Sequence, residues 1–498
     1  MSIRPLVDKK TKIIATISDF RCDVELIRQL FENGMNIVRM NTAHLTPEGM
    51  DKIINNVRAV SSEIGILIDT KGPEVRTTAV SLEDKQFKVD IKQGSTVRIY
   101  GRPDQLSTAD SICVNYAHFV NDVAPGTHVL IDDGEIDLYV TKKEEDYLVC
   151  EAQNDARLGN RKGVNVPGVR INLPSITERD KQNIMFAIDR KIDFIAHSFV
   201  RSKQDVKDVT DILKRNNSHI RVIAKIENQE GIDNIDGIIE AADGVMVARG
   251  DLGIEVPQEK IPGIQRILIR KCVVAKKPVI VATQMLQSMI NNPRPTRAEV
   301  TDIANAIFYR TDALMLSGET ANGRYPVEAV RTMAKIAAES EKTKLKDNDI
   351  RIPYRYEDND IASFLAKQAV ESIEALGIQA LVTDSHTGKT ARYLAAYRGD
   401  KPVLAMCYNE PVIRHLSISY GVIPFYQERK KDVNKRQYFL QALQMLLENG
   451  YLHLEDKVAY LSSGGKRGTG ATFLEINTIE NIFAEKSEEN NFPDAIEG

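Results

Sequence analysis

The chain has 498 residues, of which 42% are hydrophobic and 27% are charged, proportions that are ordinary for a soluble globular protein of several domains. Its 66 Lys and Arg stand against 70 Asp and Glu, and the formal net charge of -4 argues against a protein that coats nucleic acid. No apolar run approaches the roughly 18 residues of a bilayer span, and the five cysteines are scattered without metal-ligand spacing, so we expect a cytoplasmic protein with reduced thiols and no membrane segment.

Short β-branched apolar runs recur in the first part of the chain, and a longer amphipathic stretch follows each run. Near-continuous hydrophobicity is typical of strands covered on both faces, and the amphipathic stretches supply helical crossovers. The eight predicted strands are TKIIATI (11–17), NIVRM (36–40), GILIDT (65–70), DFIAHSF (193–199), RVIAKIE (221–227), GVMVARG (244–250), PVIVATQ (278–284) and DALMLSG (312–318). This alternation predicts an α/β protein with a (β/α)8 TIM barrel.

The interval between the third and fourth predicted strands is far too long for one helical crossover, which indicates an insertion. Within it, short alternating runs are separated by Gly, Asp, Asn and Pro, as in a small antiparallel barrel or sandwich. We therefore expect a β-rich lid domain at 76–170, inserted into a discontinuous barrel formed by 1–75 and 171–342. The barrel is expected to resume with a helix for which Thr177 is the N-cap.

A charged stretch with Pro and Tyr, 344–360, follows the last barrel helix and is predicted to be an exposed linker. The alternating helical and strand patterns beyond it predict a C-terminal α/β domain at 343–498. In that domain Thr387-Gly388-Lys389-Thr390 opens a helix whose N-terminus is a candidate phosphate site, beside a basic Gly-rich loop at 462–470. An ordinary capped helix and an unliganded loop are an equally weighted alternative.

Lys225 and Glu227 interrupt an apolar strand at its carboxyl end, and residues two apart in a strand point to the same side. The carboxyl ends of all strands in such a barrel meet at one rim, so Asp251 and Thr283 from the next two strands should join them around one pocket. Two carboxylates a few ångströms apart repel by about 4 kcal/mol at an effective dielectric near 20. Mg2+ is the natural cation between them, because it prefers oxygen ligands. Gly250 and Asp251 precede a turn, DLGIEVP, whose exposed backbone N–H groups suit an anion such as a carboxylate.

Other predicted strand ends add positive and polar groups to the same rim. A single strand-end Arg is more often part of a surface salt bridge than a phosphate ligand, but the coincidence of many such groups reverses that weighting. The groups are Arg39 and Asn41 after the second strand, Asp69, Thr70, Lys71 and Arg76 after the third, and Ser198 and Arg201 after the fourth. The rim is therefore predicted to bind anions.

Seven runs of residues closely resemble the pyruvate kinase family. They are IDTKGPEVRT (68–77), KGVNVPG (162–168), AKIENQEG (224–231), DGVMVARGDLGIEVP (243–257), VATQMLQSMI (281–290), PTRAE (295–299) and MLSGETANGRYPVEAV (315–330). The resemblance covers roughly 10–340 and, more loosely, the C-terminal domain, and it includes a lid inserted after the third strand. It implies transfer of the phosphoryl group of phosphoenolpyruvate to ADP, giving pyruvate and ATP, the last step of glycolysis.

The resemblance also implies roles for individual rim residues. Lys225 would contact the transferring phosphoryl group and stabilise the enolate left behind, and Thr283 would contact the substrate near the carbon that is later protonated. Glu227 and Asp251 would hold the catalytic Mg2+ (or Mn2+). The remaining implied contacts are Arg39 for the phosphate, Gly250 with Asp251 for the substrate carboxylate, and Arg76, Lys162 and His44 for the nucleotide.

The match to the family's second cation, K+, is incomplete. The implied ligands that are present are Asn41, Asp69 and Thr70. Ala43 replaces a serine that would be the fourth. Glu74 matches the residue type that accompanies potassium dependence in the family. We therefore expect activation by K+, with water or Thr42 completing the shell of ligands.

Some positions depart from the family's pattern. Ser18-Asp19-Phe20 replaces a Gly-Pro turn, MNTAHL (40–45) replaces an Asn-Phe-Ser-His-Gly pattern, and His197 stands where a small residue is common. The resemblance implies a homotetramer, and a phosphorylated metabolite is the effector expected at the C-terminal domain, although a tryptophan common in the family's effector loop is absent. Two alternatives are a metal-dependent aldolase or lyase, which would not explain the nucleotide-facing Arg76 and Lys162, and a non-catalytic paralogue.

Overall fold

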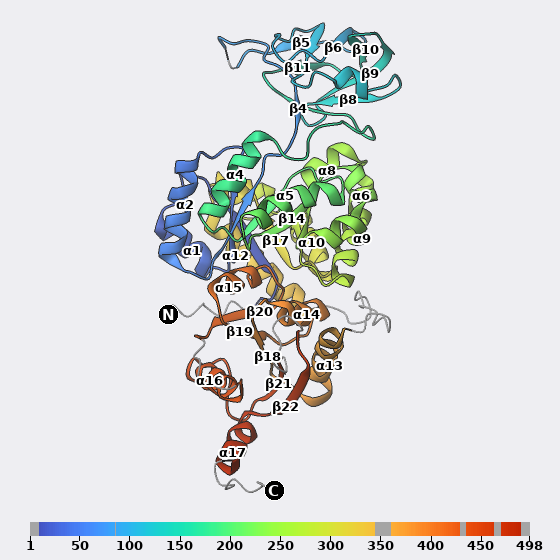
Figure 1. Cartoon of the computed structure of the whole chain (residues 1–498). Helices are drawn as coiled ribbons and strands as arrows, with labels where there is room; N and C mark the ends of the chain where they lie inside the picture. The colour runs from blue at the N-terminus through green and yellow to red at the C-terminus, as the bar shows by residue number, and fades with distance from the viewer. Residues whose placement is uncertain (1–8, 85, 344–359, 429–434, 463–469, 490–498) are drawn as a thin grey trace.

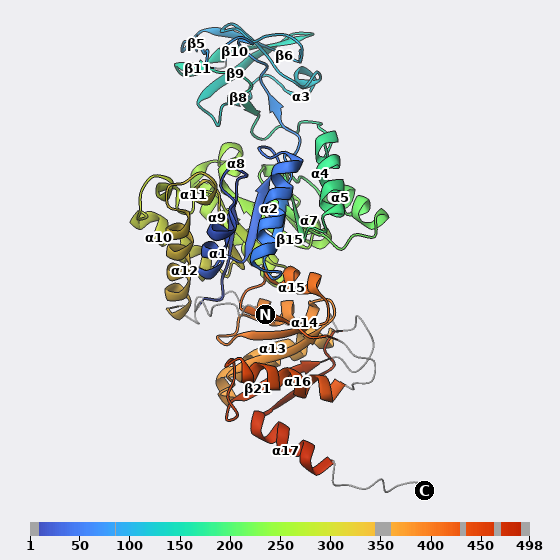
Figure 2. The same ribbon diagram turned by 90° about the vertical axis from the view of Figure 1, so that its left-hand side faces the viewer.

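The computed structural model describes residues 9–84, 86–343, 360–428, 435–462 and 470–489. A small β-rich lid, a central barrel and a C-terminal α/β domain follow one another along the molecule (Figure 1; Figure 2). The linker expected at 344–360 lies outside the described residues except for Asp360. Within the described parts of the chain, no helix has both the length and the apolar character to cross a membrane.

Eight parallel strands close into a barrel, which confirms the predicted (β/α)8 fold. In their order around the barrel they are β1 (Lys12–Thr16), β17 (Ala313–Leu316), β16 (Val279–Ala282), β15 (Gly244–Ala248), β14 (Arg221–Ile226), β13 (Phe194–His197), β3 (Gly65–Asp69) and β2 (Ile37–Asn41). Successive residues of a strand face opposite sides, so Ile14 and Leu67 pack inside the barrel while Ile13 and Ile66 pack against the helices. Burial of both faces explains the continuous apolar runs.

Helices cover the outside of the barrel (Figure 1). They are α1 (Val24–Glu32), α2 (Pro47–Val60), α4 (Glu178–Asp189), α5 (Lys203–Arg215), α7 (Ile235–Ala241), α9 (Ile261–Val274), α10 (Arg297–Phe308) and α12 (Pro326–Lys342). Thr177 is the N-cap of α4, as predicted, and it forms a capping box with Asp180. The short helices at the carboxyl rim are α6 (Gln229–Asp233), α8 (Arg249–Glu255) and α11 (Gly318–Ala321), with 3-10 turns at Gln258–Lys260 and Gln287–Ile290.

The lid contains a seven-stranded sheet of order β4-β12-β8-β9-β10-β6-β7 and a second sheet that pairs β11 with β5. The elements are β4 (Val75–Arg76), β5 (Val89–Ile91), β6 (Thr96–Tyr100), β7 (Ser111–Cys113), α3 (Phe119–Asp122), β8 (His128–Ile131), β9 (Ile136–Lys143), β10 (Tyr147–Ala152), β11 (Ala156–Leu158) and β12 (Gly163–Asn165). The expected antiparallel pairing has one exception, since β6 and β7 run parallel. Residues 101–110 carry the chain back to the same end of the sheet, which makes that pairing possible.

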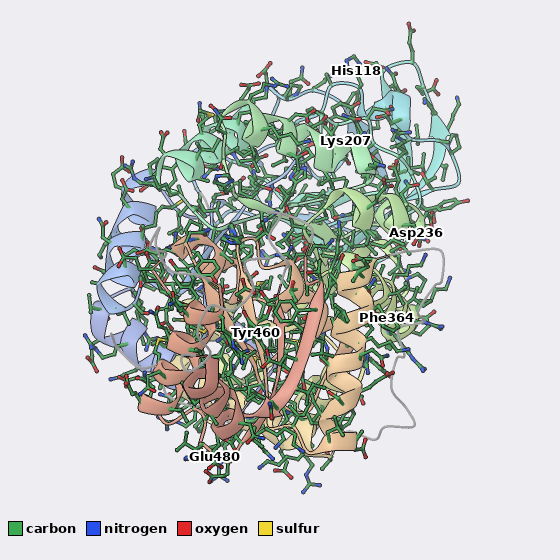
Figure 3. All side chains as sticks on the ribbon, turned by 60° about the horizontal axis from the view of Figure 1, so that its bottom comes forward. His118, Lys207, Asp236, Phe364, Tyr460 and Glu480 are labelled. Atoms are coloured by element: carbon green, nitrogen blue, oxygen red, sulfur yellow. The ribbon has the colours of Figure 1, made fainter. Side chains whose placement is uncertain are left out.

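The C-terminal domain is a five-stranded sheet of order β20-β19-β18-β21-β22. Its elements are α13 (Ile361–Leu376), β18 (Ala380–Ser385), α14 (Lys389–Tyr397), β19 (Val403–Cys407), α15 (Glu410–Leu416), β20 (Val422–Tyr426), α16 (Lys435–Glu448), β21 (Lys457–Ser462), β22 (Phe473–Thr478) and α17 (Ile479–Glu489). Helices α13 and α14 pack on one face of the sheet, and α16 and α17 pack on the other. Figure 3 places Phe364 of α13 and Tyr460 of β21 in this domain.

The C-terminal domain closes the amino-terminal end of the barrel. Ile418, which follows α15, joins the apolar cluster inside the barrel. Arg414 pairs with Asp193 at 2.6 Å and Arg398 pairs with Asp312 at 2.9 Å, and each aspartate directly precedes a barrel strand. The carboxyl rim, at the opposite end of the barrel, faces the lid (Figure 1).

Candidate active site

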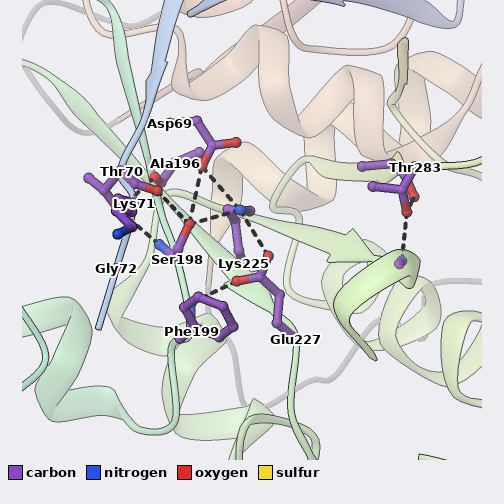
Figure 4. A network of polar contacts seen from close by, with 12 residues as sticks. Asp69, Thr70, Lys71, Gly72, Ala196, Ser198, Phe199, Lys225, Glu227 and Thr283 are labelled. Atoms are coloured by element: carbon purple, nitrogen blue, oxygen red, sulfur yellow. Dashed lines mark hydrogen bonds and ion pairs between the residues drawn. The ribbon is translucent and has the colours of Figure 1, made fainter. Parts of the chain in front are cut away.

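Lys225 lies at the centre of a buried polar network at the carboxyl rim of the barrel (Figure 4). Its Nζ lies 2.8 Å from Ser198 Oγ, 3.1 Å from Asp69 Oδ1 and 2.8 Å from Glu227 Oε1. Ser198 follows β13, Asp69 ends β3 and Glu227 follows β14, so three strand ends supply the partners. The carboxyl ends of these apolar strands thus bring the charged groups to one place.

Arg39 extends this network to β2 and β1. Its Nε and Nη2 lie 2.7 and 2.6 Å from Asp69 Oδ2, and Nη1 donates to Thr16 Oγ1 at 3.1 Å. Arg39 therefore engages one oxygen of Asp69 while Lys225 engages the other. Both cations are 8% exposed. One carboxylate thus fixes two buried cationic groups beside each other, which suits a site for an anion.

Burial and charge act in opposite directions on the ionisation of this network. Burial lowers the pKa of Lys225, but Asp69, Glu227 and Asp251 outweigh that effect and hold the pKa above its ordinary value, so the amine stays charged. Burial raises the pKa of Asp69, but Lys225 and Arg39 outweigh it and lower the pKa. For Glu227 the balance is reversed, because burial, opposed by Lys225 and aided by Asp251, raises the pKa to about 8.

The chemistry of Glu227 and Asp251 fits a divalent cation. Glu227 Oε2 accepts the backbone N–H of Phe199 at 2.7 Å, whereas Oε1 is buried and has only its ion pair with Lys225. A cation beside Glu227 and Asp251 would relieve the repulsion that raises the pKa of Glu227. No cluster of three or more His, Cys, Asp or Glu suited to a metal occurs among the described residues, and Mg2+ needs only one or two carboxylates from protein.

Thr283 and Gly250 form a second group on the rim, and Figure 4 shows Thr283 apart from the Lys225 network. Thr283 follows β16 with φ 68, a left-handed backbone that β-branched residues rarely adopt. Its Oγ1 accepts the N–H of Gly250 at 2.8 Å and donates to the carbonyl of Ala282 at 2.6 Å. Gly250 and Asp251 lie in the first turn of α8. The N–H group expected for the substrate carboxylate therefore already has the Thr283 hydroxyl as its partner.

The residues expected around K+ lie together at the ends of β2 and β3. Asn41 Oδ1 accepts the N–H of Ala43 at 3.0 Å, and Thr42 Oγ1 donates to the carbonyl of Asp69 at 2.9 Å. Thr70 follows Asp69 directly, and its N–H donates to the carbonyl of Ala196 at 3.0 Å. Amide, carbonyl and hydroxyl oxygens are the donors that a hard cation prefers.

A cavity of about 830 Å3 lies between the lid and the barrel rim. Arg76 and Lys162 line it from the lid side, and Asp251 lines it from the rim. Glu74 holds Arg76 at 2.8 Å and Asp132 holds Lys162 at 2.7 Å, so both cations project from fixed positions. The cavity is large enough for a nucleotide, and its lid wall carries these two cations together with their carboxylate partners.

Other expected residues lie away from this cavity. His44 precedes α2, is exposed and is not among the residues that line the cavity. In the C-terminal domain, Lys389 opens α14 and lies 3.7 Å from Asp360, and the N–H of Gly388 donates to Ser385 Oγ at 2.8 Å. Most of the Gly-rich loop expected at 462–470 lies outside the described residues.

Two residues that contact the site have no assigned role in the sequence analysis. Ser198 is placed on the rim there without a partner, and Arg249 is absent. The structure shows Ser198 against Lys225 and shows Arg249 Nη2 donating to the carbonyl of Thr283 at 2.7 Å. Each residue directly follows an apolar strand, and that position is the signal that could have identified them.

Comparisons with known proteins identify the family to which the chain is similar. A family model described as pyruvate kinase, barrel domain, matches residues 8–330, and a model described as pyruvate kinase, alpha/beta domain, matches 363–474. The pyruvate kinase of Borreliella burgdorferi is 44% identical over 480 residues, which cover 95% of this chain and 98% of that protein. The pyruvate kinase of Geobacillus stearothermophilus is 42% identical over 486 residues, which cover 96% of this chain and 81% of that protein. A solved pyruvate kinase structure from Cryptosporidium parvum matches with a TM-score of 0.87 and 34% identity, covering 95% of this chain and 96% of that one.

Proposed function

This chain belongs to the pyruvate kinase family and transfers the phosphoryl group of phosphoenolpyruvate to ADP, giving pyruvate and ATP, and we propose that the network around Lys225 performs the transfer. The observation that carries the proposal is the buried contact of Lys225 with Asp69 and Glu227 at the carboxyl rim. Phosphoryl transfer needs little covalent chemistry and much positioning and charge neutralisation, which such a site supplies. Family membership also removes the alternative of an aldolase or lyase.

Lys225 and Arg39 are proposed to neutralise the migrating group. When the bond from phosphorus to the enol oxygen of phosphoenolpyruvate breaks, the phosphoryl group passes to a terminal oxygen of ADP and negative charge remains on the enolate. Lys225 stays charged because carboxylates surround it, and it faces both charges. Arg39, fixed by Asp69, orients the phosphate. Both cations are in place before substrate arrives, so little reorganisation accompanies the reaction.

Glu227 and Asp251 are proposed as the ligands of Mg2+ or Mn2+. When bound, the ion supplies positive charge next to the phosphoryl and enolate oxygens. The chain's contribution is to hold the Glu227 carboxylate, which the N–H of Phe199 fixes at 2.7 Å. Repulsion between the two carboxylates raises the affinity of the site for a cation.

For K+ we propose Asn41, Asp69 and Thr70 as ligands, with water or Thr42 in place of the missing serine at Ala43. Thr42 is buried beside the carbonyl of Asp69, which supports this choice. Activation by K+ should therefore be weaker here than at a site where the protein supplies all four ligands.

The substrate carboxylate is proposed to bind the N–H groups of Gly250 and Asp251, with Thr283 near the carbon that is protonated. Because the N–H of Gly250 is bonded to Thr283 Oγ1 at 2.8 Å, an incoming carboxylate oxygen competes for that donor. Substrate binding would then free the Thr283 hydroxyl to face the substrate. Protonation of the enolate carbon completes the formation of pyruvate.

The nucleotide is proposed to bind in the cavity below the lid, against Arg76 and Lys162. Closure of the lid domain (76–170) over the barrel (1–75 and 171–342) would exclude water and bring Lys162 to the phosphates. We also propose a homotetramer in the cytoplasm and a phosphorylated metabolite effector at Thr387-Gly388-Lys389-Thr390 of the C-terminal domain (343–498).

The test of this site is a coupled assay of pyruvate formation with the variant Lys225→Met, with and without ADP, Mg2+ and K+. Loss of the Lys225 amine should abolish ATP formation, at least about a thousandfold, with the fold preserved. Lys271→Met is the matched control, because Lys271 pairs with Asp236 at 2.6 Å on the exterior of the barrel. Normal turnover by Lys225→Met would refute the role given to Lys225.

A further inference from the structure

The backbone at the end of β16 has an unusual conformation. Thr283 has φ 68 and Gln284 has φ 54, so two consecutive residues other than glycine lie in the left-handed region. A residue held in that region costs of order 1–3 kcal/mol and persists only where its surroundings over-determine it. The conformation turns the Thr283 side chain toward Gly250, whose N–H its hydroxyl accepts. Some group must stabilise this turn.

Arg249, at the end of the neighbouring strand β15, supplies that stabilisation. Its Nη2 donates to the carbonyl of Thr283 at 2.7 Å and lies 3.5 Å from the carbonyl of Gln284. The same nitrogen lies 2.8 Å from Met285 Sδ. Arg249 is 9% exposed, so its guanidinium is held away from water. A hydrogen bond from a buried charged donor is among the stronger bonds that a carbonyl accepts.

The guanidinium of Arg249 is itself anchored on its other side. Nη1 lies 2.6 Å from Asp302 Oδ2 on α10. Arg249 therefore bridges a helix outside the barrel and the strand end that carries Thr283. Because Gly250 follows Arg249 directly, the same short segment holds Thr283 at both its carbonyl and its hydroxyl.

We propose that Arg249 is a positioning residue for the reaction, which acts by fixing the Thr283 hydroxyl at the substrate. Nη1 of Arg249 is engaged by Asp302 and Nη2 by the carbonyl of Thr283, so Arg249 acts through Thr283. The inference rests on the role proposed above for Thr283. A misplacement of about 1 Å in a reacting group can cost about a hundredfold in rate, and loss of the Arg249 bond releases a strained turn that should relax by such an amount.

The test isolates the step to which Thr283 belongs. In the reverse direction, that step removes a methyl proton from pyruvate to give the enolate, and the enolate then takes up a deuteron when the solvent is D2O. NMR measures the resulting loss of the methyl proton signal with ATP, Mg2+ and K+ present. Arg249→Gln should lower this exchange and kcat by about 10- to 100-fold and leave KM for phosphoenolpyruvate within about threefold. Thr283→Ala should lower exchange similarly, and the double variant should fall no further than Thr283→Ala alone. Arg249→Lys, which keeps one charged donor, should recover part of the loss.

Arg221→Gln is the matched control. Arg221 forms the same kind of pair, with Asp243 at 2.9 Å, at the opposite end of the barrel, and its loss should leave exchange unchanged. If Arg249→Gln does not fold, Asp302→Asn keeps the guanidinium but loosens it, and a several-fold fall in exchange is expected.

Three results would overturn the inference. The first is a wild-type rate of methyl-proton exchange in a folded Arg249→Gln or Asp302→Asn variant. The second is a double variant whose fall in exchange equals the product of the two single falls. Either result would show that Arg249 does not act through Thr283, and the proposed site would stand. Wild-type exchange in Thr283→Ala would overturn both the inference and the role of Thr283.

Discussion

The hydroxyl of Ser198 lies 2.8 Å from the ammonium of Lys225 and 2.7 Å from the carbonyl oxygen of Thr70 (Figure 4). Ser198 is 2% exposed, and its own N–H donates to Thr70 Oγ1 at 3.0 Å, so the residue is locked to the end of β3. Lys225 is thereby held by a neutral oxygen as well as by carboxylates. Without Ser198, the ammonium would keep Asp69 and Glu227 as its partners.

We expect Ser198→Ala to lower kcat by about tenfold, because a hydrogen bond to a charged group contributes about 1.5 kcal/mol or more and about 1.4 kcal/mol corresponds to a factor of ten. Steady-state kinetics with phosphoenolpyruvate and ADP measures this effect. Ser202→Ala is the control, since Ser202 caps α5 in the same loop and its loss should lower stability by about 1 kcal/mol without changing turnover. Equal kcat in wild type and Ser198→Ala would contradict the positioning of Lys225 by Ser198.

Activation by K+ should be weak and should increase when a hydroxyl is restored at position 43. Ala43 lies beside Asn41, whose Oδ1 accepts the Ala43 N–H at 3.0 Å, so a serine there would add an oxygen next to a proposed ligand. We predict that Ala43→Ser lowers the K+ concentration for half-maximal turnover several-fold, while Ala43→Gly does not. Undiminished turnover of the wild-type enzyme in Tris buffer without K+ would show that the proposed K+ site is not used.

Stability should decline in mild acid partly because of His197. The ring is 1% exposed and neither of its nitrogens has a hydrogen-bond partner. Burial, opposed by Asp205 and Asp180, lowers its pKa to about 4. Histidine in the unfolded chain takes up a proton near pH 6.5, whereas the buried ring of the folded chain does so only near pH 4. The contribution of the neutral ring to folding stability is therefore complete above about pH 6.5 and is lost as pH falls toward about 4.

In wild type, the buried neutral ring should account for up to about 3 kcal/mol of the fall in the free energy of unfolding in acid, and the variant His197→Leu should lack that part of the fall. Calorimetry at about pH 7.5 and about pH 5 would show a smaller fall in the thermal midpoint than in the wild type. His453→Leu, at an exposed histidine of the C-terminal domain, should behave as the wild type does. If His197→Leu loses as much stability in acid as the wild type, burial of the neutral ring is not the cause.

The fold and part of the candidate site follow from local sequence patterns. Burial on both faces makes the barrel strands continuous in apolar residues, so Lys225 and Glu227 are conspicuous where the run ends. The two-residue period of a strand then predicts that they share a side, and the structure shows them 2.8 Å apart. Strand β20 contains Pro424 and lies at the edge of its sheet, where proline is tolerated but weakens the strand pattern.

Other features depend on tertiary contacts that sequence patterns do not encode. The left-handed backbone of Thr283 is stabilised by Arg249, a residue 34 positions away in the chain. Likewise, the rim position of Ser198 does not by itself give its contact with Lys225, and nothing local indicates that β6 and β7 pair in parallel. Such contacts arise from the closure of the barrel and the path of the lid, which place distant segments side by side.

The most direct test of the account is a crystal structure of the protein with Mn2+ and oxalate, a planar mimic of the pyruvate enolate. We predict an anomalous scattering peak within coordination distance of the Glu227 and Asp251 carboxylates, with oxalate bound to the ion and Lys225 Nζ facing the mimic. A manganese peak that contacts neither carboxylate, or oxalate bound away from Lys225, would contradict the assignment of this rim as the place where the phosphoryl group is transferred.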